Sequence, residues 1–206
     1  MARQRRWFAA GLLAGLATLD RSIGVVSIVP VIAECLAARG GGEPGWLWRR
    51  IVTVMAPSAV AGVTYLVFAW WAFGDPLAHV QMEAAVRGAV AAPWQPFIDM
   101  WRSGVRVHAF NNSLFDATLA VVAVAALPAV FTRVRASYGV YALLIIMIPL
   151  SGSLMSFNRL LLPSFPHAIL LARRINGPAQ TAAVLIPLGV LEAVLTAAFA
   201  TWHWVA

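Results

Sequence analysis

The chain of 206 residues is 61% hydrophobic and only 11% charged, and its mean hydropathy is +0.80. Soluble domains carry about 25% charged residues, so this composition excludes a water-soluble fold, and it excludes intrinsic disorder, which requires low hydrophobicity. The formal net charge is +7, but the arginines lie as pairs between apolar runs, which fits orientation in a bilayer better than nucleic-acid binding. We therefore expect an all-α, polytopic helical bundle in the cell membrane, with the lipid bilayer and not nucleic acid as its partner.

Four segments are long enough to cross the bilayer, which takes about 20 apolar residues in a helix. They are residues 51–74, 111–131, 136–158 and 179–200. The last segment contains one ionisable residue, Glu192. Because a charge inside a membrane is costly, we expect Glu192 to face the interior of the bundle.

Two further apolar stretches are each too short or too interrupted to cross as one ordinary helix. Residues 7–36 are interrupted at their centre by Asp20, Arg21 and Ser22, and residues 160–172 contain two prolines. A chain reversal at 20–22 would leave flanks of about 12 to 14 residues, shorter than a spanning helix.

The distribution of arginines favours that reversal. Without it, the arginines divide equally between the two sides of the membrane. With it, ten arginines share one side with a single loop acid, Glu43, while the arginines on the opposite side are balanced by acids. The ten are Arg3, Arg5, Arg6, Arg39, Arg49, Arg50, Arg133, Arg135, Arg173 and Arg174.

The positive-inside rule assigns the arginine-rich side to the cytoplasm. This predicts about seven hydrophobic segments, including two short, partly penetrating hairpins, in a single transmembrane domain over residues 1–206. The N-terminus is then cytoplasmic, the C-terminus is extracytoplasmic, and residues 75–110 form an external amphipathic loop.

The short flanks place charged residues below the external membrane surface. A helix of 12 to 14 residues rises about 18 to 21 Å, so Asp20 and Arg21 should be recessed, and so should Arg159 at the head of the second short segment. Two guanidiniums in one recess would suit a phosphate or pyrophosphate, whose oxygens match their paired planar donors. The alternative is that Asp20 merely neutralises Arg21 while Arg159 extends towards the interface.

The external loop begins with a helix-start signal, with Asp75 as the expected N-cap and Pro76 as the first helical residue. The helix that follows is amphipathic, with Gln81 and Arg87 mostly off its apolar face, and should lie on the membrane surface. Such a helix is either an interface-anchored linker or a lid over the recess. Motifs of soluble enzymes and metal sites do not occur; we predict no metal site or cofactor in this chain and leave divalent-metal dependence open.

Three stretches resemble successive blocks of the phosphatidylinositol-glycan class V mannosyltransferases and their bacterial homologues, which are multi-pass glycosyltransferases of the GT-C type. The stretches are AGLLAGLATLDRSIGVVSIVPVIAE at 10–34, FGDPLAHVQMEAAVRGAVAAPW at 73–94 and SFNRLLLPSFPHAILLA at 156–172. Their order and spacing match as well, so the resemblance covers most of the chain. It implies transfer of mannose from a polyprenyl-phosphate donor on the extracytoplasmic face, by an inverting displacement.

Substrate-binding positions follow from the resemblance residue by residue. The matching residues are Arg21, Asp75, Gln81, Arg87, Trp94 and Arg159, and Asp20 is a candidate beside them. The chain departs from the family at four positions, with Asp20 for threonine, His79 for an aromatic residue, Val86 for tryptophan and Leu160 for tyrosine.

The family's acidic catalytic base lies in a first external loop that precedes the region of resemblance. We therefore expect this chain to be the C-terminal part of a larger GT-C domain, acting with a missing N-terminal half or a partner subunit. The chemistry agrees, because a carboxylate paired with an arginine, as expected for Asp20, is a poor proton acceptor. No catalytic base is assigned.

Two other classes of function compete with the transferase. Intramembrane charges and broken helices are equally expected of a transporter or flippase of an anionic lipid or solute. The third class is a non-catalytic membrane subunit.

Overall fold

The computed structural model describes residues 6–38, 45–88, 90–107 and 113–201, and every regular element in these ranges is a helix. The elements in chain order are α1 (Trp7–Asp20), the 3-10 helix η2 (Ser22–Ser27), α2 (Ile28–Ala37), α3 (Trp46–Phe73), α4 (Ala78–Arg87), α5 (Gln95–Ser103), α6 (Leu114–Ala129), the π-helix η3 (Val130–Val134), α7 (Ala136–Leu150), α8 (Phe157–Leu161), α9 (Phe165–Ala172) and α10 (Pro178–Ala200).

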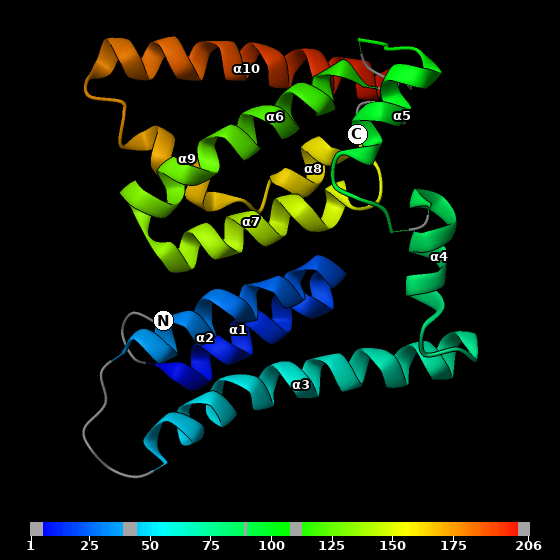
Figure 1. The fold of residues 1–206 in the computed structure, drawn as a ribbon, viewed down its shortest axis with the longest axis vertical. Helices are drawn as coiled ribbons and strands as arrows, with labels where there is room; N and C mark the ends of the chain where they lie inside the picture. Colours follow the sequence, from blue (N-terminus) through cyan, green and yellow to red (C-terminus); the bar gives the residue numbers. More distant parts are fainter. Residues whose placement is uncertain (1–5, 39–44, 89, 108–112, 202–206) are drawn as a thin grey trace.

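The chain reverses where the arginine distribution predicted it. Helix α1 ends at Asp20, Arg21 has an extended backbone, and η2 leads into α2, which returns alongside α1 (Figure 1). The turn, α4, α5 and the connection between α7 and α8 therefore lie at one end of the bundle. The ends of α2 and α9 and the starts of α3, α7 and α10 lie at the other end.

Close packing against α3 sets the position of α1. A Cβ atom on Gly11 would collide with the carbonyl oxygen of Val54, and the Ser58 hydroxyl donates a hydrogen bond to the Gly11 carbonyl at 2.9 Å. Helices approach this closely in membranes where small residues face one another. The contact fixes the height of α1 along α3, and with it the position of the turn at Arg21.

The largest buried cluster lies between α6, α7 and α8. Ala120, Ala142 and Ile146 are completely buried at the α6–α7 contact, and Phe157 at the start of α8 is completely buried beside them. Small side chains on α6 let α7 approach closely. This packing carries the connection between α7 and α8 to the end of the bundle that holds Arg21.

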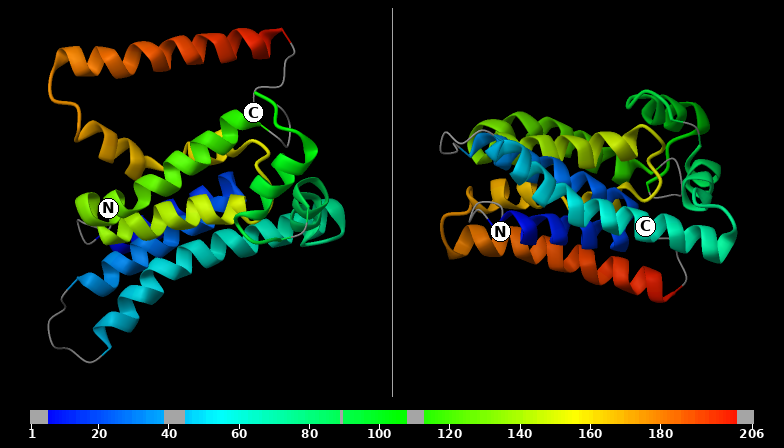
Figure 2. Two further views of the ribbon diagram at one scale, coloured as in Figure 1. Left: turned by 45° about the horizontal axis from the view of Figure 1, so that its top comes forward. Right: turned by 90° about the horizontal axis from the view of Figure 1, so that it is seen from below.

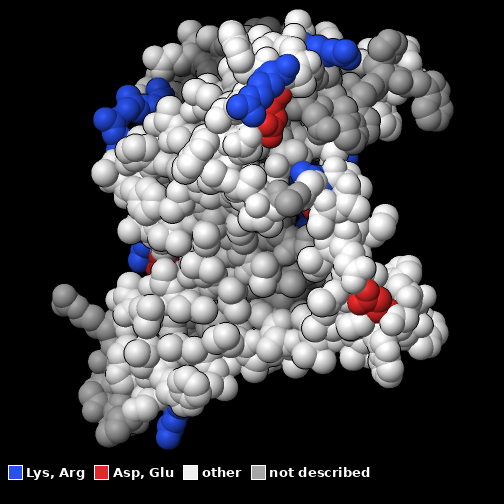
Figure 3. Space-filling model, turned by 45° about the vertical axis from the view of Figure 1, so that its right-hand side comes forward, with Lys and Arg blue, Asp and Glu red and all other residues white. Residues whose placement is uncertain are grey.

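Three of the four predicted spanning segments are long and apolar enough to cross a membrane in the described part of the chain. They are Trp46–Phe73, Leu114–Val134 and Pro178–Ala200. The described part of the chain is thus helical with three helices that could span a membrane, and the face drawn in Figure 3 carries few charged side chains on a largely uncharged surface. Seven segments and the orientation of the termini stay predictions.

The fourth predicted segment, 136–158, is not one helix. Helix α7 ends at Leu150 after 15 residues, and a non-helical connection follows before α8 begins at Phe157. The absence of charged residues from 136–158 indicates an apolar environment, but it does not show that the whole segment is helical. A turn is favoured by Ser151, Gly152 and Ser153, because the serine side chain competes for backbone hydrogen bonds and glycine loses more conformational entropy in a helix than other residues do.

The expectation that Glu192 faces the bundle interior is wrong for this structure. No residue of α10 is buried, and Glu192 is exposed. Helix α10 stands apart from the other helices in the left view of Figure 2 and makes no substantial contact with any of the described helices. Hydropathy predicted the helix correctly, but it carries no information on what the helix packs against.

Candidate functional site

The site is built around the segment from Met155 to Arg159, which comprises the end of the α7–α8 connection and the first residues of α8. Ser156 has φ 54° and ψ 32° and is buried, and it is the one non-glycine residue with positive φ among the described residues. Such left-handed backbone is strained for a serine and concentrates at functional sites. The conformation turns the chain sharply so that α8 begins at the end of the bundle.

A buried carboxylate holds this segment in place. Asp116 is 1% exposed, and its Oδ1 accepts a hydrogen bond from the backbone N–H of Asn158 at 2.9 Å. The side-chain oxygen of Asn158 in turn accepts from the backbone N–H of Arg159 at 2.7 Å. The first turn of α6 therefore positions Arg159. In the sequence, Asp116 was only a charged residue near the start of a predicted spanning segment. The one signal for its position was Ser113, three residues earlier, whose hydroxyl caps the helix by accepting a hydrogen bond from the N–H of Asp116.

The structure brings Arg21 and Arg159 together across 138 positions of sequence. The Arg21 guanidinium donates from Nη1 to the carbonyl oxygen of Arg159 at 3.5 Å. Neither arginine forms an ion pair within the described residues, and Asp20 is exposed and does not pair with Arg21. The neutralised turn, in which Asp20 would satisfy Arg21, is thus not what the structure shows.

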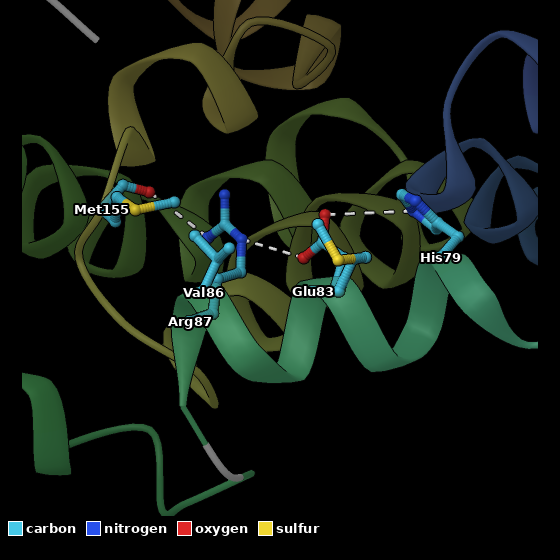
Figure 4. A pocket seen from close by; sticks show the side chains of 6 residues that line it. His79, Glu83, Val86, Arg87 and Met155 are labelled. Atoms are coloured by element: carbon cyan, nitrogen blue, oxygen red, sulfur yellow. Dashed lines mark hydrogen bonds and ion pairs between the residues drawn. The ribbon is translucent and has the colours of Figure 1, made fainter.

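A third arginine reaches the same segment from α4. Arg87 donates from Nη1 to the Met155 carbonyl at 3.3 Å, and its Nε lies 2.9 Å from a carboxylate oxygen of Glu83. Beside these groups is an open cavity of about 200 Å³ (Figure 4). It is lined by His79, Met82, Glu83, Val86, Arg87 and Met155.

The other predicted site residues do not contact the arginines. Asp75 accepts hydrogen bonds from the Leu77 N–H at 2.8 Å and from the Gln81 side chain at 2.6 Å, so Asp75 and Gln81 bind each other. Helix α4 begins at Ala78, after Leu77 as its N-cap residue, so the predicted N-cap at Asp75 is wrong by two residues. Asp75 instead closes a side-chain turn, which aspartate favours. Trp94, immediately before α5, is 66% exposed.

The predicted external loop of 75–110 contains two helices, α4 and α5, over its described part; residues 89 and 108–110 lie outside the described residues. It is joined to the α7–α8 connection by a backbone hydrogen bond from the N–H of Ala91 to the carbonyl of Ser151 at 2.7 Å. The loop therefore contacts the α7–α8 connection, as an element covering the recess would.

Sequence reasoning missed one charged residue at the opposite end. Glu34 on α2 is 7% exposed; one of its oxygens lies 2.6 Å from Arg135 Nε and accepts a hydrogen bond from the Ser137 hydroxyl at 2.5 Å. A single acid in an apolar run gives no indication of its partners, which lie at the start of α7, about 100 positions later.

In the described ranges, no three side chains that commonly ligate metals come together. A comparison of the chain with protein families, curated proteins and solved structures finds no match.

Proposed function

We propose that this protein binds the phosphate of a polyprenyl-phosphate-linked sugar on the extracytoplasmic face of the membrane. In this proposal it forms part of a GT-C-type mannosyltransferase. The observation that carries the proposal is that Arg21 and Arg87, from two distant parts of the chain, donate hydrogen bonds to main-chain carbonyls of the short segment that contains Arg159. The resemblance of the sequence to the class V mannosyltransferases supports the same function.

The charge state of these arginines favours an anionic ligand. Arg21 and Arg159 have no carboxylate partner among the described residues, and the only contact between them is to a main-chain carbonyl. An unpaired guanidinium near a membrane is costly in free energy, so it favours the binding of an anion. A phosphate suits this role, since its oxygens accept paired hydrogen bonds from the planar donor group.

The surroundings suit a lipid-linked ligand. Leu162, directly after α8, is 80% exposed, and Phe165 at the start of α9 is 43% exposed. These exposed apolar side chains, which follow Arg159 in the chain, would contact an isoprenoid chain, which prefers apolar surroundings to water. A headgroup at the arginines and a tail along α8 and α9 would then be bound together.

The test is a conservative substitution that keeps charge but removes the paired donors. Arg21→Lys and Arg159→Lys, in the chain reconstituted in nanodiscs, should each weaken binding of polyprenyl-phosphate mannose by about tenfold or more, which is about 1.4 kcal/mol. Arg102→Lys is the matched control, because Arg102 is exposed on α5 at the same end of the bundle. It should change the affinity less than about twofold.

Wild-type affinity in both lysine variants would overturn the proposal. That result is expected if the two arginines only extend a charge to the membrane interface, where lysine serves equally well.

A further inference from the structure

We propose that Arg50, flanked by the indole rings of Trp7 and Trp46, binds the phosphate of an anionic phospholipid at the end of the bundle opposite to Arg21. This inference does not rest on the proposed function, because none of these three residues belongs to the donor site. It assigns the protein a second phosphate-binding site, whose ligand is a lipid of the surrounding bilayer.

The first observation is that three segments meet around the Arg50 guanidinium. Arg50 lies near the start of α3, and its guanidinium carbon is 4.4 Å from the ring centroid of Trp46 at the start of the same helix. It is 5.7 Å from the ring centroid of Trp7 at the start of α1. Its Nη1 atom donates a hydrogen bond at 3.3 Å to the main-chain carbonyl of Ala38, directly after α2. These contacts hold the guanidinium in place before any ligand binds.

The second observation is that the guanidinium uses only part of its hydrogen-bonding capacity. Arginine carries five N–H donors, and only Nη1 of Arg50 has a hydrogen-bond partner among the described residues. Arg50 also forms no ion pair in the described part of the chain. Its side chain is half-buried, and its Nε and Nη2 atoms are not among the enclosed polar atoms that lack a partner, so both are open to a ligand.

The geometry of the stacked arginine suits a phosphate. Stacking on an aromatic ring uses the face of the guanidinium, whereas its N–H groups point outwards along the edge. The N–H groups of Nε and Nη2 on Arg50 form a parallel pair, which matches two oxygens of one phosphate. A phosphate bound there would also supply the charge partner that Arg50 lacks within the described residues.

The third observation is the position of Arg50 along its helix. It immediately precedes the apolar run 51–74, so it lies where a spanning helix leaves the hydrocarbon. Tryptophan prefers this boundary, and Trp7 and Trp46 stand at the starts of α1 and α3, at the end of the bundle where α2 ends (Figure 1). The phosphates of membrane lipids lie at the same level, which favours a lipid over a soluble phosphate.

The surface of α3 beyond Arg50 suits the rest of a lipid. Trp48 is 69% exposed, and Val52 and Met55 are 44% and 45% exposed. Acyl chains prefer such apolar side chains to water. A lipid whose phosphate contacts Arg50 can therefore extend its acyl chains along the same helix.

The local charge favours an anionic lipid over a zwitterionic one. Arg49, next to Arg50, is exposed, and the positive-inside rule assigns this end of α3 to the cytoplasmic side. The cytoplasmic leaflet carries anionic lipids, which basic residues near the surface attract. A zwitterionic lipid offers the same phosphate, but its ammonium group would be repelled by the neighbouring arginines.

The experiment titrates the delipidated full chain in detergent and counts bound lipid by native mass spectrometry. The probe is dioleoyl phosphatidylglycerol, and the comparison ligands are dioleoyl phosphatidylcholine and glycerol 3-phosphate. The first phosphatidylglycerol should bind to the wild-type protein about fivefold or more tightly than either comparison ligand.

Two variants of Arg50 and one of Arg49 locate the site. Arg50→Lys keeps the charge but loses the paired donors, so phosphatidylglycerol should bind about fivefold or more weakly. Arg50→Gln and Arg49→Gln are a matched pair, because each removes one positive charge near the start of α3. Arg50→Gln should weaken binding about tenfold, and Arg49→Gln less than about twofold. Binding at Arg21 and Arg159 is common to both glutamine variants, so it does not affect their comparison.

A change in folding is distinguished from a change in the site by two further measurements. Thermal unfolding of the lipid-free protein should be the same for Arg50→Lys and the wild type within a few degrees. Trp46→Phe keeps a ring for packing but attracts the guanidinium less than an indole does, so it should weaken phosphatidylglycerol binding about two- to threefold. This second variant decides the matter if Arg50→Lys does not fold.

Three results would overturn the proposal. They are unchanged phosphatidylglycerol affinity in Arg50→Lys and Trp46→Phe, equal losses of affinity in Arg50→Gln and Arg49→Gln, and equal affinity of the wild type for phosphatidylglycerol and phosphatidylcholine. Binding of glycerol 3-phosphate as tightly as phosphatidylglycerol would overturn the assignment to a lipid and indicate a soluble phosphate as the ligand.

Discussion

The two ends of the helical bundle use arginine in different ways. At one end, Arg135 lies 2.6 Å from the buried Glu34 carboxylate, which also accepts a hydrogen bond from Ser137. At the other end, Arg21 reaches only the main-chain carbonyl of Arg159, and neither of these arginines has an acidic partner in the described residues. The Arg135 guanidinium is paired within the fold, whereas those of Arg21 and Arg159 are available to a ligand.

Helix α7 connects these two environments. Its start carries Ser137 and follows Arg135, and its end leads into the segment that contains Ser156 and Arg159. A fixed ion pair at one end of α7 helps to hold the helix whose other end presents the site. The presence of a charged residue in an apolar bundle therefore does not show whether it stabilises the fold or binds a ligand; the group that it pairs with does.

The largest expected difference between the two ends is their side of the membrane. In a Cys35→Ala background, cysteine at Ser22 or Ser103 should react with an impermeant maleimide added outside, and cysteine at Asn176 should not, because the positive-inside rule assigns the α9–α10 connection to the cytoplasm. All three positions are exposed, so access within the protein does not differ. Permeabilised cells provide the control in which Asn176→Cys reacts. External labelling of Asn176→Cys in intact cells would invalidate the orientation.

The next largest effect is on stability. Arg135→Ala leaves the buried Glu34 carboxylate without its cation and should lower the free energy of unfolding by about 2 to 3 kcal/mol, below the range for fully buried pairs because Arg135 is 42% exposed. Arg21→Ala should cost less than about 1 kcal/mol. Denaturation of the purified protein in detergent measures both, with Arg133→Ala, an exposed residue of η3, as the control. Equal decreases in the free energy of unfolding for Arg135→Ala and Arg21→Ala would contradict the claim that only Arg135 stabilises the fold.

A smaller effect should follow from weakening the support of Arg159. Asp116→Asn keeps an oxygen that can accept from the Asn158 N–H but loses the charge, so we expect a loss of about 1 kcal/mol in stability and a few-fold weaker donor binding. Asp99→Asn, at an exposed acid of α5, is the control and should change neither quantity. Unchanged donor affinity in both Asp116→Asn and Asp116→Ala would show that the carboxylate does not position the site.

Part of this fold could be predicted because apolar length and arginine distribution can be read along the sequence without knowledge of tertiary contacts. Apolar length located α3, the α6–η3 helix and α10 to within a few residues, and the arginine distribution located the reversal at Arg21. The break after α7 was missed, because hydropathy does not distinguish an apolar turn from an apolar helix.

The pairings in the site depend on tertiary packing and had no such signal. Glu34 with Arg135, and Asp116 with Asn158, join residues far apart in sequence through helix contacts that no periodicity encodes. The proximity of Arg21 and Arg159 was expected only because Arg21 follows one short segment and Arg159 precedes the other, which should leave both below the same membrane surface. His79 was identified as a departure from the family, but its ring contact with Tyr65 and its position near Glu83 required the structure.

The central claim is that Arg21 and Arg159 hold a lipid-linked phosphate, and a competition measurement tests it most directly. Wild-type protein in nanodiscs is loaded with labelled polyprenyl-phosphate mannose and titrated with sugar-free polyprenyl phosphate or with the corresponding polyprenol. Because the arginines bind the phosphate group, polyprenyl phosphate should displace the donor at least about tenfold more effectively than polyprenol, and the advantage should disappear in the Arg21→Lys/Arg159→Lys double variant. Equal competition by the two lipids against the wild-type protein would contradict the claim.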